Sequence, residues 1–136
     1  MNKLVFIIDD DPVYLQFMQS HFRQMDGFDV EVYSSGSAAL EQLEDKNPFM
    51  IILDHNLNDP SGDGLHYLHQ IKKRKGSVPI LYITSDGTES LRKNVLKKGA
   101  KALIVKSDSF LVQLRTAIDE IMASKQKGFF SRMFNA

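Results

Sequence analysis

The chain has 136 residues, of which 43% are hydrophobic and 25% charged, a composition typical of one globular domain with a substantial core. It contains no cysteine, which excludes disulfides and thiolate metal sites. The formal net charge is zero, but residues 1–63 hold 12 acids and 3 bases, whereas residues 64–136 hold 5 acids and 14 bases. The basic second half could attract nucleic acid or anionic lipid, although solvated helix faces are the simpler interpretation.

The first apolar run covers only residues 4–8 before an acidic stretch begins. Such a run is too short for a signal peptide or a membrane span. We therefore expect a soluble, cytoplasmic protein.

The first half of the chain alternates apolar runs with helical patterns. Residues 3–8 predict a buried strand, and the helix expected over about 12–26 starts on a proline, which suits a first turn. Residues 29–33 alternate like a short strand, and a helix over about 36–45 follows. Residues 49–53 predict the most apolar strand of the chain.

The second half continues the same alternation. Residues 56–64 are rich in Asn, Asp, Pro, Ser and Gly, which predicts a loop. A helix over about 65–75 comes next, and its basic end suits the negative end of the helix dipole. Residues 79–84 and 102–105 predict strands, separated by a weakly patterned helix over about 88–98.

The last helix is expected to begin at Asp108, which would cap it, and to carry Leu111, Leu114, Ile118 and Ile121 at helical spacing. Five strands thus alternate with five helices, a pattern that predicts an α/β fold with a parallel sheet and helices on both faces. In such sheets, ligands bind beyond the carboxyl ends of the strands.

Polar side chains stand where four of the predicted strands end. The first strand gives Asp9 and Asp10, the third gives Asp54, the fourth Thr84 and the fifth Lys106. If the first and third strands are neighbours, the three acids share one pocket. Packed carboxylates repel one another unless a cation lies among them. Mg²⁺ suits such a site, since it binds oxygen ligands from one or two carboxylates plus waters.

This set of side chains is suited to phosphoryl transfer, where positioning and charge neutralisation supply most of the catalysis. Asp54 would attack a phosphorus atom and form an acyl phosphate. Mg²⁺ held by Asp10 and Asp54 would neutralise the incoming oxygens. Lys106 would pair with the phosphoryl group, and Thr84 would hydrogen-bond to it.

Several short segments match one known family in their order and spacing. They are Phe6-Ile7-Ile8-Asp9-Asp10, Ile52-Leu53-Asp54-His55-Asn56-Leu57 with Ser61-Gly62, Leu81-Tyr82-Ile83-Thr84-Ser85, and Gly99-Ala100 followed by Val105-Lys106. With them the chain resembles the receiver domain of bacterial two-component response regulators over about residues 3–125. The resemblance implies a flavodoxin-like, doubly wound (βα)5 fold with a five-stranded parallel sheet of order 2-1-3-4-5.

The resemblance also implies a phosphorylation-activated switch. Asp54 would accept phosphate from the phosphohistidine of a histidine kinase or a histidine phosphotransfer protein. Mg²⁺ would be the cofactor, bound by Asp10, Asp54 and the backbone carbonyl of Asn56, with Asp9 reaching the ion chiefly through water. Thr84 would shift toward the phosphate and remodel the surface made by the fourth helix, the fifth strand and the fifth helix.

Such a protein would accept and slowly lose its own phosphoryl group, so it is not expected to be a turnover enzyme. Its output would be a contact with a downstream protein, or phosphate passed along a relay, and a weak homodimer is compatible with it. No direct contact with nucleic acid or membrane is expected, since no recognition-helix module stands outside the sheet domain.

The chain departs from the family pattern at several positions. Ser107 follows Lys106 where receivers usually have proline after a cis bond, and a cis bond before serine costs about 2.5–4 kcal/mol, which favours trans without deciding between the two. Asn58 stands where a proline is usual, and Leu103 where many receivers have the Tyr or Phe that rotates inward. In the family, the position of Asp86 borders the path of the water that hydrolyses the acyl phosphate, so Asp86 could influence dephosphorylation. A plain exposed loop acid is an equally good interpretation.

Other functions fit the sequence less well. A pseudo-receiver that only binds proteins is opposed by the complete set of acids, threonine and lysine. A haloacid-dehalogenase-like phosphatase would carry a second acid where this chain has Asn56, and usually needs a longer chain. His66 and His69 could serve zinc from one helix face, with His55 as a third ligand, but solvated or packing roles are favoured.

Residues 126–136 form a separate, amphipathic tail. If this tail is helical, Phe129, Phe130, Met133 and Phe134 share one side, with basic residues nearby. It could be a docking peptide or a surface-membrane anchor. The alternatives are a tail packed on its own domain or a partly disordered one. As a hypothesis, it makes an apolar contact between chains.

Overall fold

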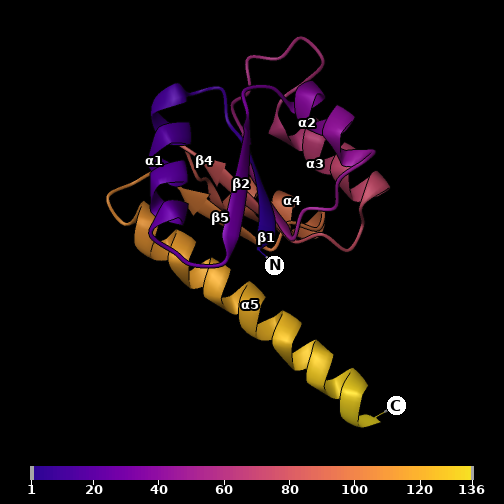
Figure 1. The fold of residues 1–136 in the computed structure, drawn as a ribbon. Helices are drawn as coiled ribbons and strands as arrows, with labels where there is room; N and C mark the ends of the chain where they lie inside the picture. The colour runs from indigo at the N-terminus through magenta and orange to yellow at the C-terminus, as the bar shows by residue number, and fades with distance from the viewer. Residues whose placement is uncertain (1, 136) are drawn as a thin grey trace.

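The computed structural model of the protein describes residues 2–135, which form a parallel sheet with helices on both faces (Figure 1). Within this range the strands are β1 (Lys3–Ile8), β2 (Phe28–Tyr33), β3 (Met50–Asp54), β4 (Ile80–Thr84) and β5 (Ala102–Val105). The helices of the same range are α1 (Pro12–Arg23), α2 (Gly36–Leu43), α3 (Gly64–Arg74), α4 (Glu89–Lys97) and α5 (Phe110–Asn135).

The strand order of the described sheet is β2-β1-β3-β4-β5. The predicted α/β class and the predicted order 2-1-3-4-5 are therefore confirmed. From β1 the chain adds β2 on one side, and from β3 it adds β4 and β5 on the other, so the winding direction reverses between β1 and β3. The carboxyl ends of these two strands are the place where such folds bind ligands.

The core lies in two layers, one on each face of the sheet. Alternate side chains of β1 divide between them, with Phe6 and Ile8 on one face and Val5 and Ile7 on the other. Helices α2, α3 and α4 cover the first face, and α1 and α5 cover the second (Figure 1). Every residue of β3 and β4 is buried, as expected for central strands covered on both faces. This packing fixes where the central strands end.

The helices begin close to the edge of the sheet, where side chains can cap their first turns. Asp11 caps α1, where its carboxylate accepts a hydrogen bond from the amide of Val13 at 2.9 Å. The predicted cap of the last helix at Asp108 is wrong, because a turn over 107–110 precedes α5 and the helix begins directly after Ser109. Ser109 therefore occupies the position before the helix, and its carbonyl accepts a hydrogen bond from the amide of Gln113 at 3.0 Å.

Helix α5 is 26 residues long, and its second half projects away from the body of the domain (Figure 1). Residues 126–135 of the predicted tail continue this helix without a break at Gly128, and residue 136 lies outside the described range. Phe129, Phe130, Met133 and Phe134 are between 44% and 75% exposed, so they do not pack on their own domain. No helix within residues 2–135 combines the length and the hydrophobicity needed to cross a membrane.

Candidate functional site

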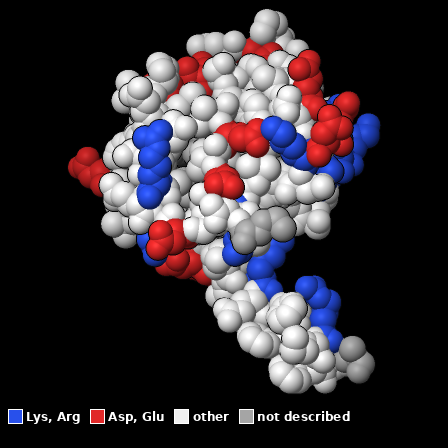
Figure 2. All heavy atoms as spheres, viewed as in Figure 1, with Lys and Arg blue, Asp and Glu red and all other residues white. Residues whose placement is uncertain are grey.

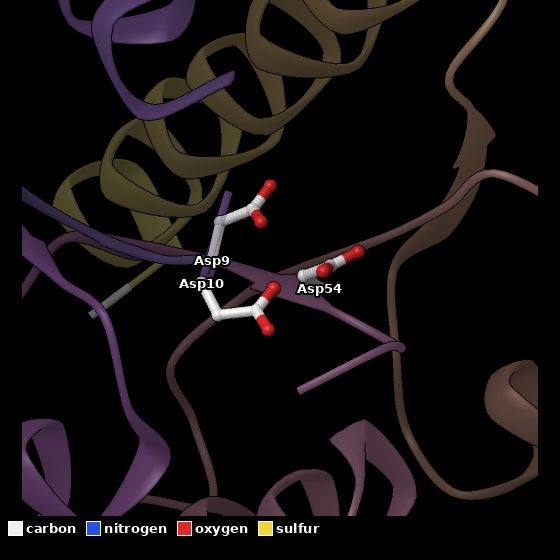
Figure 3. Close-up of side chains that lie close together, drawn as sticks. All are labelled: Asp9, Asp10 and Asp54. Atoms are coloured by element: carbon white, nitrogen blue, oxygen red, sulfur yellow. The ribbon is translucent and has the colours of Figure 1, made fainter. Parts of the chain in front are cut away.

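The acidic side chains of the first and third strands meet at one edge of the sheet. β1 and β3 pair in parallel with Ile8 beside Leu53, so Asp9 and Asp54 follow at the same level. One carboxylate oxygen from each of Asp9, Asp10 and Asp54 lies within 4.8 Å of the others. Figure 3 shows the three carboxylates projecting into the same region beyond the strand ends. The sequence prediction that these acids share a pocket is therefore confirmed.

Lys106 brings a positive charge into this pocket from the end of β5. Its Nζ lies 2.9 Å from Asp9 Oδ2 and 3.3 Å from Asp54 Oδ1. The side chain of Lys106 is 8% exposed, and those of the two acids are 0% and 2% exposed. The ammonium also lies 4.3 Å from the ring centre of Tyr14, a cation–π contact that stabilises its position. The sequence interpretation missed Tyr14, which only its place one turn into α1 could have indicated.

The charged groups of the pocket shift one another's pKa values. Burial, followed by repulsion from Asp9, raises the pKa of Asp54 to about 7, although Lys106 opposes this shift. Burial alone would lower the pKa of Lys106, but Asp9 and Asp54 outweigh it and raise the pKa above its usual value. Lys106 is therefore charged at neutral pH, and further positive charge in the pocket would favour the ionised form of Asp54.

The donor set of the pocket fits a divalent cation. Among the described residues, Asp9 Oδ2 and Asp54 Oδ1 are buried oxygens without an assigned hydrogen-bond partner, and each lies within ion-pair distance of Lys106. When ionised, three carboxylates and one ammonium leave two uncompensated negative charges. An all-oxygen set with that charge suits Mg²⁺, a hard cation with a preference for carboxylates and waters.

Asp10 is the most solvent-facing acid of the three. Its Oδ2 accepts a hydrogen bond from the backbone amide of Asn58 at 3.2 Å, which ties the loop after β3 to the end of β1. Asn58 is one of the positions where the family usually has proline, and proline has no amide hydrogen to donate. In this chain the departure from the family pattern therefore supplies a contact to the pocket.

Thr84 and Asn56 lie near the acids but are engaged with neighbours. Thr84 is fully buried at the end of β4, and its hydroxyl oxygen accepts a hydrogen bond from the backbone amide of Asp86 at 3.2 Å. Asn56 is exposed, and its side-chain amide donates to the hydroxyl of Ser85 at 3.4 Å. These contacts join the loops after β3 and β4 at the rim of the pocket.

The backbone behind Asp54 is held by contacts that the sequence interpretation did not include. The amide of Gly64 donates to the carbonyl of His55 at 2.9 Å, and the ring of His55 contacts the hydroxyl of Tyr82 through Nδ1 at 2.5 Å. Tyr82 is fully buried in β4. These contacts fix the chain directly after Asp54, and they could not be recognised from residue types alone.

Within residues 2–135 no peptide bond is cis, so the Lys106–Ser107 bond is trans, and the amide of Ser107 donates to the carbonyl of Val105 at 2.9 Å. In the part of the chain that the structure describes, only the three acids gather closely enough to offer three metal ligands. His66 instead packs edge-on against Tyr67.

Solved structures with the same fold are numerous. A CheY-like response regulator receiver domain protein from Methanospirillum hungatei superposes with a TM-score of 0.80, covering 93% of this chain and 99% of that chain at 20% sequence identity. The receiver domain of Francisella response regulator 1452 gives 0.78, covering 90% and 99% at 23% identity. At these identities the likeness shows the fold alone.

Curated relatives are longer than this chain. The alkaline phosphatase synthesis transcriptional regulatory protein PhoP of Bacillus subtilis is 31% identical over 106 residues, which are 78% of this chain and 43% of that protein. The luminescence regulatory protein LuxO of Vibrio campbellii is 30% identical over 95 residues, 68% of this chain and 20% of that protein. The chain thus spans less than half the length of these relatives.

The family itself follows from a match along most of the chain. The family description "response regulator receiver domain" fits residues 5–119. Receiver domains are signalling switches of two-component systems that respond to phosphorylation, which is the class that the sequence predicted. The sheet order, the acidic pocket and this match agree, and the chain belongs to the response regulator receiver domain family.

Proposed function

We propose that Asp54 is the phosphoacceptor of this receiver domain, and that Lys106 and Thr84 position the phosphoryl group. The observation that carries the proposal is the ion pair of 3.3 Å between Asp54 and Lys106 inside a pocket with two further acids. A buried carboxylate at a strand end has little structural reason to stand beside two others. Their common purpose is to prepare a site for a doubly charged cation and a phosphoryl group.

The donor would be the phosphohistidine of a histidine kinase or of a histidine phosphotransfer protein. A carboxylate oxygen of Asp54 attacks the phosphorus atom, and a P–O bond forms as the P–N bond breaks. The electron pair of that bond returns to the imidazole nitrogen, which takes up a proton. The products are an acyl phosphate on Asp54 and an unmodified histidine on the donor.

The metal would be Mg²⁺, held by the carboxylates of Asp10 and Asp54 and the backbone carbonyl of Asn56, with Asp9 acting chiefly through water. When bound, Mg²⁺ neutralises charge on the pocket and on the phosphoryl oxygens. Asp9 would also position Lys106, because its carboxylate lies 2.9 Å from the ammonium and would hold it close to Asp54. Lys106 would then pair with a phosphoryl oxygen.

Thr84 would carry the signal away from the site. Its hydroxyl now contacts the backbone of Asp86, with the Asp86 amide donating to it at 3.2 Å. A phosphoryl group on Asp54 would compete for this hydroxyl and weaken its hold on the loop. The next residue, Gly87, lies tightly on Val105 and close to Leu103 in β5, as a Cβ added there would meet Val105 Cγ2.

The same loop leads into α4, and Arg92 of α4 donates to the carbonyl of Leu103 at 3.1 Å. A shift of Thr84 would therefore move Gly87 against β5 and change how α4 sits on that strand. The output surface would be the face made by α4, β5 and α5. In this chain Leu103, which is 2% exposed, would take part by packing and without the hydroxyl of a tyrosine.

The protein would act in the cytoplasm as a switch that loses its phosphoryl group slowly, and not as a turnover enzyme. Its downstream partner would be a protein that binds the output surface. Residues 126–135 are proposed to be an amphipathic appendage to the receiver domain, although they belong to helix α5.

The test is phosphorylation in vitro. The protein is incubated with Mg²⁺ and phosphoramidate or acetyl phosphate, and intact mass is measured for a labile phosphate adduct. We expect the adduct in the wild type and not in Asp54→Asn, and a much lower yield in Asp10→Asn or without Mg²⁺. Asp108→Asn, which removes an exposed acid outside the pocket, is the matched control and should leave the yield unchanged. An adduct that persists in Asp54→Asn would exclude Asp54 as the acceptor.

A further inference from the structure

A cavity of about 390 Å³ lies at the opposite end of the molecule from the acidic pocket. It is lined by the segments that precede β4 and β5, by α3, and by the part of α5 that leaves the domain. Its charged lining residues are all basic: Lys72, Lys101, Lys125 and Arg132. Figure 2 shows Lys and Arg gathered where the projecting helix leaves the body and along one side of that helix.

These cations lack the acidic partners that would make them structural. Among residues 2–135, no carboxylate lies within salt-bridge distance of any of the four, although other lysines and arginines of the chain have such partners. Lys101 and Arg132 are exposed and make no side-chain hydrogen bond within the described residues. Lys125 contacts the ring of Phe49, 5.3 Å from its centre, but has no acidic partner either. The four positive charges around the cavity repel one another, and an anion among them would relieve that repulsion.

Lys72 is the most firmly placed member of the set. Its ammonium donates to the carbonyls of Val78 at 3.0 Å and Gly76 at 3.3 Å, which fixes it on the wall of the cavity. An ammonium has three donors, so one N–H remains for a ligand. Burial and then repulsion from Lys101 lower the pKa of Lys72.

Two glycines keep the cavity open. Gly99 has φ +104°, a conformation that favours glycine, and a Cβ added there would meet Lys72 Cε at 3.1 Å, so the lysine side chain would have to shift slightly. Gly128 lies inside helix α5, where glycine lowers helix stability by about 0.5–1 kcal/mol relative to alanine. An added Cβ there would meet only Arg132, at 4.0 Å, so packing does not require this glycine. Its effect is to leave room on the side of α5 that faces the cavity.

We propose that this cavity binds a phosphoanion with at least two negative charges, held between Lys72 and Lys101 of the domain and Lys125 and Arg132 of α5. The planar guanidinium of Arg132 suits bidentate contact with phosphate oxygens, and the lysines act as point charges. Such a ligand would join the projecting half of α5 to the domain. The phosphate could belong to a soluble molecule or to a lipid headgroup, and the two sources are separated by experiment.

The soluble probe is inorganic tripolyphosphate, titrated into the full chain without Mg²⁺, so that the acidic pocket stays negative and does not compete for it. Binding is followed by calorimetry and by amide NMR, where the signals of Gly99 and Gly128 report on the cavity. We expect saturable binding, a shift of both glycine signals, and affinity about tenfold weaker or worse in Lys101→Gln and in Arg132→Gln.

Two further variants distinguish binding at a specific site from non-specific electrostatic attraction. Lys93→Gln removes the same charge from exposed α4, outside the cavity, and should keep wild-type affinity. Gly128→Leu keeps all four charges but fills the cavity, and should abolish saturable binding. Absence of binding, or equal losses in Lys93→Gln and Arg132→Gln, would overturn the proposal.

The lipid source is tested with phosphatidylcholine vesicles that contain phosphatidylinositol bisphosphate. Vesicle binding that tripolyphosphate displaces and Arg132→Gln weakens would assign the site to a lipid headgroup. Tripolyphosphate binding without vesicle binding would assign it to a soluble phosphoanion. Vesicle binding that is unaffected by tripolyphosphate and by Arg132→Gln would exclude a lipid headgroup as the ligand of this cavity.

Discussion

The backbone carbonyl of Asp54 lies directly against Gly64, where an added Cβ would meet that oxygen at 2.4 Å. The same Cβ would meet the hydroxyl of Tyr82 at 2.6 Å and the α-carbon of His55 at 2.7 Å. The first residue of α3 is therefore in close contact with the backbone that carries the proposed phosphoacceptor. A side chain can enter only if the end of β3 moves.

We predict that Gly64→Ala lowers the free energy of unfolding by about 1–3 kcal/mol, the usual cost of overpacking, and slows phosphorylation of Asp54. Gly128→Ala is the matched control, since its nearest neighbour would be 4.0 Å from the new Cβ. This control should be neutral or gain up to about 1 kcal/mol from helix propensity. Urea unfolding of both variants checks the prediction, which fails if Gly64→Ala is as stable as the wild type.

Acidic pH should stabilise the metal-free protein through Asp54. Its pKa rises from 3.8 to about 7 on folding, first through burial and then through Asp9. Between these values the folded state binds more protons than the unfolded state, so this contribution to stability is complete below pH 4 and is lost as the pH rises to 7. The slope is at most about 1.4 kcal/mol per pH unit.

Unfolding in urea with a chelator, from pH 4 to pH 8, measures this slope. The comparison is Asp54→Asn, in which this contribution is absent and the curve should be flatter. Added Mg²⁺ should raise the stability of the wild type most at neutral pH, where the carboxylates are ionised. Parallel curves for the wild type and Asp54→Asn would show that Asp54 has no raised pKa.

Lys106 should be needed for stability only while its acidic partners are charged. Lys106→Met leaves two buried carboxylates without their cation, and we expect a loss of about 3–5 kcal/mol in the metal-free protein at pH 8. Adding Asp54→Asn should restore part of this loss, because one buried charge is removed. Equal losses in the single and double variants would show that Lys106 acts only by packing.

The sequence predicted the fold and the central acids well, for an identifiable reason. Apolar runs that stop on acids fix where strands end, and a parallel sheet brings those ends to one edge, so Asp9, Asp10 and Asp54 could be grouped from residue order alone. Lys106 could be added for the same reason. Tyr14 and Gly64 could not, because their contacts depend on how α1 and α3 sit on the sheet.

Two of the departures from the family pattern coincide with backbone hydrogen bonds. Asn58 and Ser107 stand at positions that usually hold proline, and in both the amide donates a hydrogen bond, to Asp10 and to Val105 respectively. Proline could donate neither. The incorrect cap at Asp108 has a similar origin, because a turn of backbone hydrogen bonds, invisible in residue types, delays the start of α5. Local backbone contacts are thus what the sequence predicted least.

The last prediction concerns the path from the pocket to α4. If the hydroxyl of Thr84 leaves Asp86 for a phosphoryl group, the loop that packs on Leu103 must move with it. Beryllofluoride with Mg²⁺, a mimic of the phosphoryl group, should therefore shift backbone amide signals over residues 85–105, most of all at Gly87. We expect the shifts to disappear in Asp54→Asn and to be much smaller in Thr84→Val, which keeps the shape of the side chain without its hydroxyl. Unchanged signals over 85–105 in the wild type, with the mimic bound, would show that the output does not pass through this loop.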